Sequence, residues 1–194
     1  MKVTVLAAGL FSCIFAVTAV AADKPSKASA QTILNLYATA TEAWGMLQQD
    51  STAILVDVRD PVEAKFTGFA TPTDIHIPFM VADPHGWSYM NSSWEMVKNP
   101  AFETQLTDKL SQLGANSDTP IIVMCRSGSS RSAPAVNMLA AKGYQNVWTV
   151  VDGFEGSTLK EGASKGVRAV NGWRNSGLPW SYKVDSAVAW RPSK

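Results

Sequence analysis

Three short, continuous apolar runs constrain the fold of this chain more than any other feature of its sequence. They read AILVDV at 53–58, TPIIVM at 119–124 and NVWTVV at 146–151. Strands that are apolar along their whole length are typical of a parallel sheet buried on both faces. Helical patterns lie between the runs, and this alternation predicts an α/β fold with a parallel central sheet and helices on both faces.

Caps and helical periodicity place the helices between these runs. Thr39 and Glu42 have the spacing of a capping box, in which two side chains satisfy free backbone N–H groups at the start of a helix. Glycines mark the expected ends of two later helices. The predicted helices cover residues 40–49, 99–114 and 129–143, and a short one opens at Pro61. Short strands are predicted in 33–38 and 74–78, and residues 79–98 are expected to form a long surface excursion because they show no clear periodicity.

Length and charge exclude several classes of protein. A chain of 194 residues is large enough for one domain with a real core, and it contains no repeat at a fixed period. Its formal net charge is +1, and its aromatic residues are not interleaved with basic clusters. A nucleic-acid partner is therefore not expected.

The first residues have the pattern of a secretory signal. One lysine is followed by an apolar stretch that ends near Val20, and then by small residues and Asp23. We expect a signal peptide over 1–22 with cleavage after Ala22, which would leave a periplasmic or secreted protein without membrane contact. An uncleaved anchor is the alternative, because the apolar run approaches the ~20 residues that span a bilayer. After the signal, we expect a linker over 23–34, one domain over 35–185 and a C-terminal tail over 186–194.

Cleavage would leave a single cysteine in the mature protein. The chain has two cysteines, and Cys13 lies in the expected signal peptide, so Cys125 would remain alone and without an internal disulfide. Such an odd thiol is either buried and inert or kept for reactivity. The chain has only two histidines, His76 and His85, so no metal site built from cysteine and histidine is expected.

The sequence CRSGSSRS at 125–132 surrounds this thiol with groups that bind anions. Gly128 lets the backbone curl, and Arg126 and Arg131 add permanent positive charge. A helix expected to begin near Ser130 would direct free N–H groups toward the loop. Each of these influences favours the thiolate, so we expect a depressed cysteine pKa and a cradle for an oxyanion.

Four segments together resemble the rhodanese (sulfurtransferase) family. They read VDVRDPVEAKFTGF at 56–69, HIP at 76–78, CRSGSSRS at 125–132 and DGFEG at 152–156, and their order and spacing match over about residues 36–180. The resemblance implies a rhodanese-like fold, no cofactor and a catalytic Cys125 that takes a sulfane sulfur as a persulfide. It also implies that loop amides hold a small sulfur-containing anion. The implied binding residues are Arg126, Ser127, Gly128, Ser129, Ser130 and Arg131.

Other polar residues are expected to support the structure. Asp57 and Arg59 match the family's DVR element, and the resemblance implies that they tie the strand end to neighbouring backbone. Glu63 matches an acidic position of the family and is expected to be structural as well. We expect His76 to be a satisfied, semi-buried histidine rather than an acid or base, and His85 to lie at the surface.

The chain departs from the family pattern in two places. Common rhodanese loops place an arginine five positions after the cysteine, whereas Arg131 comes six positions after Cys125. This longer loop is similar to the phosphate loop of tyrosine phosphatases, and cell-cycle phosphatases and some arsenate reductases use it on a rhodanese fold. Those enzymes usually have a histidine where Met124 stands here. The second departure is an insertion at 157–170, expected to be a surface loop.

Three functions are consistent with these residues. The first is a periplasmic sulfurtransferase that moves sulfur from thiosulfate or polysulfide through a Cys125 persulfide to a thiophilic acceptor. The second is a phosphatase or arsenate-reductase-like enzyme that uses the longer loop. The third is a sulfur carrier without turnover, which would deliver its persulfide to a protein acceptor. The cysteine itself does not separate the first from the third.

Overall fold

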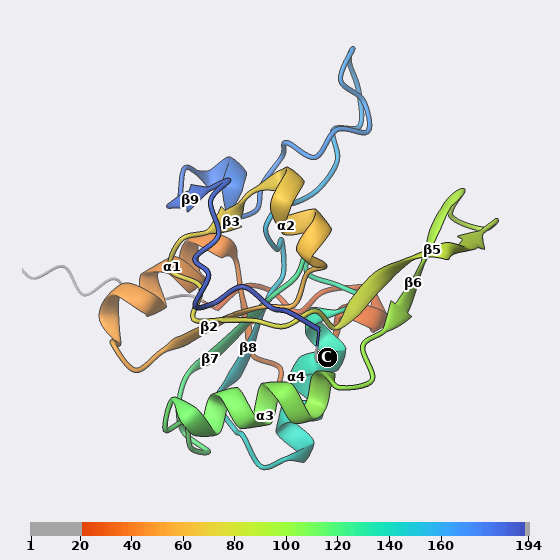
Figure 1. Ribbon diagram of the computed structural model, residues 1–194. Helices are drawn as coiled ribbons and strands as arrows, with labels where there is room; N and C mark the ends of the chain where they lie inside the picture. The colour runs from red at the N-terminus through yellow and green to blue at the C-terminus, as the bar shows by residue number, and fades with distance from the viewer. Residues whose placement is uncertain (1–20, 193–194) are drawn as a thin grey trace, which may run out of the picture.

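A parallel five-stranded sheet forms the centre of the protein. The structure is a computed structural model, and it describes residues 21–192 (Figure 1). The strands lie in the order β1-β8-β7-β2-β4, and each neighbouring pair is parallel, as the apolar runs predict. Their bounds are Tyr37–Ala38 for β1, Ile54–Asp57 for β2, Ile75–His76 for β4, Ile121–Met124 for β7 and Val147–Val150 for β8.

Helices cover both faces of this sheet, as predicted. Leu106 of α3 and Leu139 of α4 pack with Val123 in one buried cluster, whereas Ala43 of α1 packs with Ile122 in the other. Successive residues of a strand point to opposite faces, so β7 contributes to both clusters. Figure 1 shows α3 and α4 on one side of the sheet and α1 and α2 on the other. The bounds are Ala40–Gln49 for α1, Pro61–Thr67 for α2, Phe102–Gln112 for α3 and Ser132–Ala141 for α4.

Two of the helices begin with complete capping boxes. The Thr39 hydroxyl accepts from the Glu42 N–H at 3.2 Å, and the Glu42 carboxylate accepts from the Thr39 N–H at 2.7 Å. Asp60 and Glu63 cap α2 in the same reciprocal way. Such caps satisfy backbone donors that the helix itself leaves free. The α2 cap also places Glu63 beside the loop that follows β7, which matters for the site.

The segment 79–98 is a surface excursion, but it is more regular than the sequence indicates. It forms an antiparallel hairpin of β5 (Met80–Ser88) and β6 (Ser93–Lys98), which projects from the body in Figure 1. The register shifts between Asp83 and Trp87, and such a bulge breaks the alternation of side chains that would reveal a strand. Trp87 and Trp94 pack edge to face across the hairpin with ring centroids 5.9 Å apart.

Several element boundaries also differ from the predictions. The first strand is only two residues long, and α4 begins at Ser132 because residues 126–131 are used to curve around the thiol. Two strands that the sequence did not indicate, β3 (Phe69–Ala70) and β9 (Trp180–Ser181), pair antiparallel. Two short 3-10 helices complete the fold, η1 at Ala28–Ala30 and η2 at Arg174–Ser176.

The expected signal peptide falls almost wholly on residues that the structure does not describe. Cys13 and the apolar run that ends near Val20 lie outside the described residues. Within 21–192, no helix is both long enough and apolar enough to cross a membrane. The expected cleavage after Ala22 therefore stays a prediction.

Candidate active site

The thiol of Cys125 lies at the carboxyl end of β7, where ligands bind in parallel α/β sheets. Only 2% of the residue is exposed, so the sulfur is buried where the following loop begins. The loop curves at Gly128, whose φ is +70°, and a Cβ there would lie 2.0 Å from the Val151 carbonyl oxygen. Only glycine combines this backbone conformation with such close contact. This glycine is therefore required by the loop shape.

The turn DGFEG at 152–156 supports the loop from behind. The Phe154 N–H donates to the Cys125 carbonyl at 2.8 Å, and the Glu155 N–H donates to the Arg126 carbonyl at 2.9 Å. Gly153 lies so close that a Cβ there would approach the Cys125 carbonyl oxygen to 2.5 Å. With these carbonyls occupied by the turn, the loop can direct its N–H groups toward the sulfur.

Four groups offset the effect of burial on the pKa of the Cys125 thiol. Burial raises the pKa of Cys125, but the Arg131 charge, the Ser132 hydroxyl and the N–H groups of Ser127 and Ser132 hold that pKa below its ordinary value. The Ser132 oxygen lies 3.4 Å from the Cys125 sulfur, and it can donate to the thiolate. Opposite charge and donated hydrogen bonds both favour the ionised form. The site therefore favours the nucleophilic thiolate over the neutral thiol.

The Arg131 guanidinium also forms an ion pair with Glu63. Its Nη2 donates to Glu63 Oε1 at 2.9 Å, and its Nη1 donates to Glu63 Oε2. Burial raises the pKa of Glu63, and the hydrogen bonds and charge of Arg131 more than offset this and lower it. The two side chains are 9% and 19% exposed. This two-pronged contact fixes the arginine where its charge acts on Cys125.

The two arginines of the loop occupy different environments. We expected both to surround the thiol, but the Arg126 side chain is 46% exposed and its nearest carboxylate contact is Glu63, with 3.9 Å between Nε and Oε1. Arg131 alone brings its charge to the sulfur through a buried contact. The side-chain hydroxyls of Ser127, Ser129 and Ser130 make no hydrogen bond within residues 21–192.

Asp57 and Arg59 form a second ion pair just below the loop. Both side chains are fully buried, and Arg59 Nη2 lies 2.6 Å from Asp57 Oδ2. The same Nη2 donates to the Gly68 carbonyl at 3.0 Å, Nη1 donates to Thr67, and the guanidinium stacks 3.9 Å above the Phe154 ring. Arg59 thus connects the end of β2, the end of α2 and the turn that supports the cysteine loop.

The two histidines lie apart from the thiol loop. His76 is 4% exposed, more deeply buried than we expected, and its Nε2 lies 3.0 Å from the Arg59 carbonyl oxygen. Its Nδ1 has no hydrogen-bond partner within the described chain, so the expectation of a satisfied histidine holds for one ring nitrogen and not for the other. A cavity of about 270 Å³ beneath the C-terminal segment includes His76 in its lining. His85 is exposed on the hairpin, in the surface position we expected.

Sequence reasoning missed two residues near the thiol. Ser132 contacts the sulfur directly. The sequence signal that could have identified it is its position immediately after Arg131 in the cysteine loop. Arg168 belongs to the insertion at 157–170, yet its Nη1 donates to the Gly156 carbonyl at the base of the site. Only the folded chain reveals this contact, because nothing in the local sequence distinguishes Arg168 from the lysines beside it.

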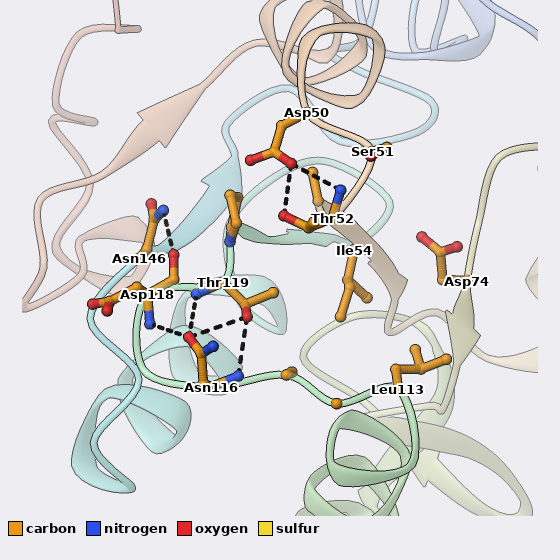
Figure 2. Close-up of a pocket in the computed structure, with 14 residues that line it drawn as sticks. Asp50, Ser51, Thr52, Ile54, Asp74, Leu113, Asn116, Asp118, Thr119 and Asn146 are labelled. Atoms are coloured by element: carbon orange, nitrogen blue, oxygen red, sulfur yellow. Dashed lines mark hydrogen bonds between the residues drawn. The ribbon is translucent and has the colours of Figure 1, made fainter.

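Another cavity lies at the opposite end of the strands. It has a volume of about 620 Å³ and is lined by residues near the amino ends of the strands, among them Asp50, Asp74 and Asn116 (Figure 2). Many of its polar groups are already paired with each other, as the dashed lines from Asn116 to Thr119 show. Within residues 21–192, no three His, Cys, Asp or Glu side chains are grouped so that they could hold a metal ion. The Cys125 thiol at the carboxyl ends of the strands therefore remains the candidate site.

Comparisons with known proteins agree with this geometry. A model of the rhodanese-like domain matches residues 39–159. The uncharacterized protein RP600 of Rickettsia prowazekii is 33% identical over 142 residues, which cover 73% of this chain and 94% of RP600. The thiosulfate sulfurtransferase GlpE of Actinobacillus succinogenes is 30% identical over 142 residues, covering 73% of this chain and 86% of GlpE.

A solved structure shows the same fold. The crystal structure of Rv0390 from M. tuberculosis superposes with a TM-score of 0.59 and 29% sequence identity, covering 76% of this chain and 97% of Rv0390. The matched residues 39–159 include the DVR element, the cysteine loop and the turn that supports it. Sequence, site geometry and fold agree, and the chain belongs to the rhodanese-like domain family.

Proposed function

We propose that this protein is a sulfurtransferase that carries sulfane sulfur as a persulfide on Cys125. The observation that carries the proposal is a buried cysteine at the end of β7, with the Ser132 hydroxyl oxygen 3.4 Å from its sulfur and a pKa that is lowered although burial opposes it. A chain does not need that arrangement for packing, because a buried neutral thiol behaves as a small apolar side chain. The similarity to GlpE, a protein named thiosulfate sulfurtransferase, supports the same activity.

The reaction follows from the position of the thiolate beneath the loop. With thiosulfate as donor, the Cys125 thiolate attacks the outer sulfur, the S–S bond breaks, and sulfite leaves with the bonding electron pair. The Ser127 and Ser132 N–H groups, which lower the pKa of Cys125, can then stabilise the resulting persulfide anion. An acceptor such as cyanide takes the terminal sulfur and restores the thiolate.

Intact-mass measurement tests the proposal. The protein without its signal segment should gain the mass of one sulfur atom after thiosulfate or polysulfide, and it should lose that mass after cyanide. Cys125→Ser should fold normally and show neither change, because the hydroxyl is a poor nucleophile at neutral pH. Absence of the added sulfur on the wild type with both donors would refute the proposal. Repeated turnover with cyanide separates an enzyme from a carrier that discharges only to a protein acceptor.

An oxyanion-processing enzyme is a second candidate, and one observation favours it. Arg131 comes six positions after Cys125, and its charge acts on the sulfur as it would in a phosphate loop. Loop circumference determines which anion can approach the sulfur while the amides point at its oxygens. Deletion of Ser129 would restore the shorter interval. We expect this variant to keep sulfur transfer, whereas a true phosphate cradle would show aryl phosphate hydrolysis in the wild type and lose it on deletion.

The periplasmic location is part of the same proposal. It depends on the apolar run and the small residues before Asp23. Amino-terminal sequencing of the protein from the natural host should find Asp23 or a neighbour as the first residue. A chain that still begins at Met1 would contradict export with cleavage.

A further inference from the structure

The segment before β1 packs against the helix that follows the cysteine loop. Its 3-10 helix η1 contacts α4, and Ala30 and Thr32 are only 4% and 5% exposed. The Ile33 N–H donates to Asn137 Oδ1 at 2.9 Å. The family model begins at residue 39, so this segment lies outside the matched part of the chain. It is a wall that the matched domain by itself does not supply.

A cavity of about 400 Å³ lies where this segment meets the end of the cysteine loop. It is lined by side chains from the segment, the loop and α4, among them Ser29, Gln31, Ser130, Pro134 and Asn137. Ser130 belongs to the loop itself, and the hydroxyl oxygen of nearby Ser132 is 3.4 Å from the Cys125 sulfur. The cavity therefore borders the residues that surround the thiol.

The lining of this cavity offers hydrogen bonds but no charge. None of the described residues that line it is acidic or basic. The Asn137 oxygen accepts from a backbone N–H, so the Asn137 amino group is left to donate. The Gln31 nitrogen donates to the Pro25 carbonyl at 2.9 Å, so the Gln31 oxygen is left to accept. The Ser29 and Ser130 hydroxyls make no hydrogen bond within the described chain. An amide, which carries one acceptor and one donor, matches this set.

We propose that this cavity binds the amide part of an uncharged thiol that accepts the transferred sulfur. The inference rests on the proposed function and names its acceptor class: small thiols with amide groups near the sulfur, such as a cysteine whose amino and carboxyl groups are both in amide linkage. An anionic donor would gain no compensating charge from this lining, so the cavity suits the acceptor better than the donor.

The transfer to such a thiol needs no further reactant. The acceptor thiolate attacks the terminal sulfur of the protonated Cys125 persulfide, and the S–S bond within that persulfide breaks. Cys125 leaves as a thiolate with the bonding electron pair, and the acceptor keeps the transferred sulfur and its proton as a new persulfide. The groups that lower the pKa of Cys125 favour this leaving thiolate. The cavity contributes by holding the acceptor beside the loop.

Kinetics with two acceptor thiols tests the cavity. N-acetylcysteine N-methylamide carries two amides, and 2-mercaptoethanol carries none. Ser29→Tyr places a ring in the cavity and should lower kcat/KM for the first thiol by about tenfold, the loss expected for one or two neutral hydrogen bonds. The loss with 2-mercaptoethanol should stay below about twofold, because that thiol makes no amide hydrogen bonds. Ser26→Tyr is the matched control: it makes the same change at an exposed residue outside the lining, and it should alter neither reaction.

Asn137→Asp tests one hydrogen bond without filling the cavity. The carboxylate keeps an oxygen for the Ile33 N–H but replaces the amino donor with an acceptor. The amide-bearing thiol should again lose about tenfold in kcat/KM. The 2-mercaptoethanol reaction reports any effect of the added charge on the Cys125 thiol. An equal loss with both acceptors would refute the hydrogen bond.

A binding measurement separates this inference from the proposed function. Cys125→Ser cannot form a persulfide, so an NMR titration of this variant with N-acetylcysteine N-methylamide reports binding alone. The amide signals of 28–31 and 133–137 should shift, and adding Ser29→Tyr should weaken the binding by about tenfold. If the wild type transfers sulfur but Ser29→Tyr behaves like Ser26→Tyr with both thiols, the acceptor site is wrong while the sulfurtransferase stands. If no persulfide forms and the titration still shows this binding, the amide site stands and the sulfurtransferase fails.

Discussion

Two arginine–carboxylate pairs of this protein show how differently the same chemistry can be used. Asp57 and Arg59 are fully enclosed, and their free hydrogen-bonding groups are taken by backbone and by Thr67. The Arg131 and Glu63 side chains keep 9% and 19% of their surface exposed, and the arginine charge also acts on the Cys125 sulfur. The Asp57–Arg59 pair connects elements of the scaffold, whereas the Glu63–Arg131 pair influences the pKa of the reactive thiol.

The physical reason for this difference is the cost of isolating a charge. A fully buried ion must be paired, because moving it from water costs several kcal/mol or more. The end of β2 meets that requirement with a pair that contacts three separate elements. The Glu63–Arg131 pair retains some contact with water, so replacing either residue should cost less free energy of unfolding than breaking the Asp57–Arg59 pair. It should also change the pKa of the Cys125 thiol. The following experiments test that contrast.

Breaking the enclosed pair should have the largest effect. Arg59→Met leaves Asp57 buried without a counter-charge, and we expect a loss of about 3–5 kcal/mol in the free energy of unfolding. Urea denaturation measures this loss. The double variant Asp57→Leu, Arg59→Met should be less destabilised than the two single changes together, because neither charge is then left alone. A loss below about 1 kcal/mol for Arg59→Met would mean that the pair is not structural.

Removing Arg131 should change reactivity more than stability. Arg131→Gln deletes the charge that offsets burial of the thiol, so the pKa of Cys125 should rise and alkylation should shift to higher pH. Sulfur transfer at pH 7 should fall by about tenfold or more, because less thiolate is present. Arg126→Gln is the control, since its side chain is exposed and should leave the alkylation midpoint nearly unchanged. Equal shifts in both variants would contradict the assignment of Arg131.

Acid should weaken the protein through both carboxylates. The folded-state pKa values of Asp57 and Glu63 lie below their ordinary values of 3.8 and 4.5, so each contributes stability that is complete above those values. That contribution is lost as pH falls through the folded pKa. Glu63→Gln should remove only its own share, which makes the decline in unfolding free energy below pH 4.5 less steep. An unchanged pH profile would show that Glu63 gains no stability from its pair.

Glu63→Gln should also produce the smallest effect, a downward shift of the Cys125 pKa. Without the carboxylate, the Arg131 charge is no longer shared and acts more fully on the thiolate. Alkylation should therefore become faster at low pH by about twofold or more. The change is opposite in sign to that of Arg131→Gln. A shift in the same direction would show that Glu63 acts by holding the arginine in position and not by balancing its charge.

Sequence patterns predicted the scaffold well because its causes are local. The three apolar runs became β2, β7 and β8, and the Thr39 capping box begins α1 at the expected residue. The hairpin at 80–98 was not recognised as strands, because its bulge disrupts the alternation and its side chains are mostly exposed. The binding role expected for the loop residues from Arg126 to Arg131 stays a prediction, and the sequence did not indicate the separate environments of the two arginines.

The sequence by itself determined a parallel α/β sheet with Cys125 at the carboxyl end of a buried strand. Apolar runs, caps and glycines act within a few residues of each other, so these features can be read along the chain. Only the tertiary structure decided which charges meet at the sulfur. Glu63 lies 68 positions from Arg131, and Arg168 returns from an insertion to contact Gly156. The pKa of Cys125 depends on such distances in space, and a sequence records only distances along the chain.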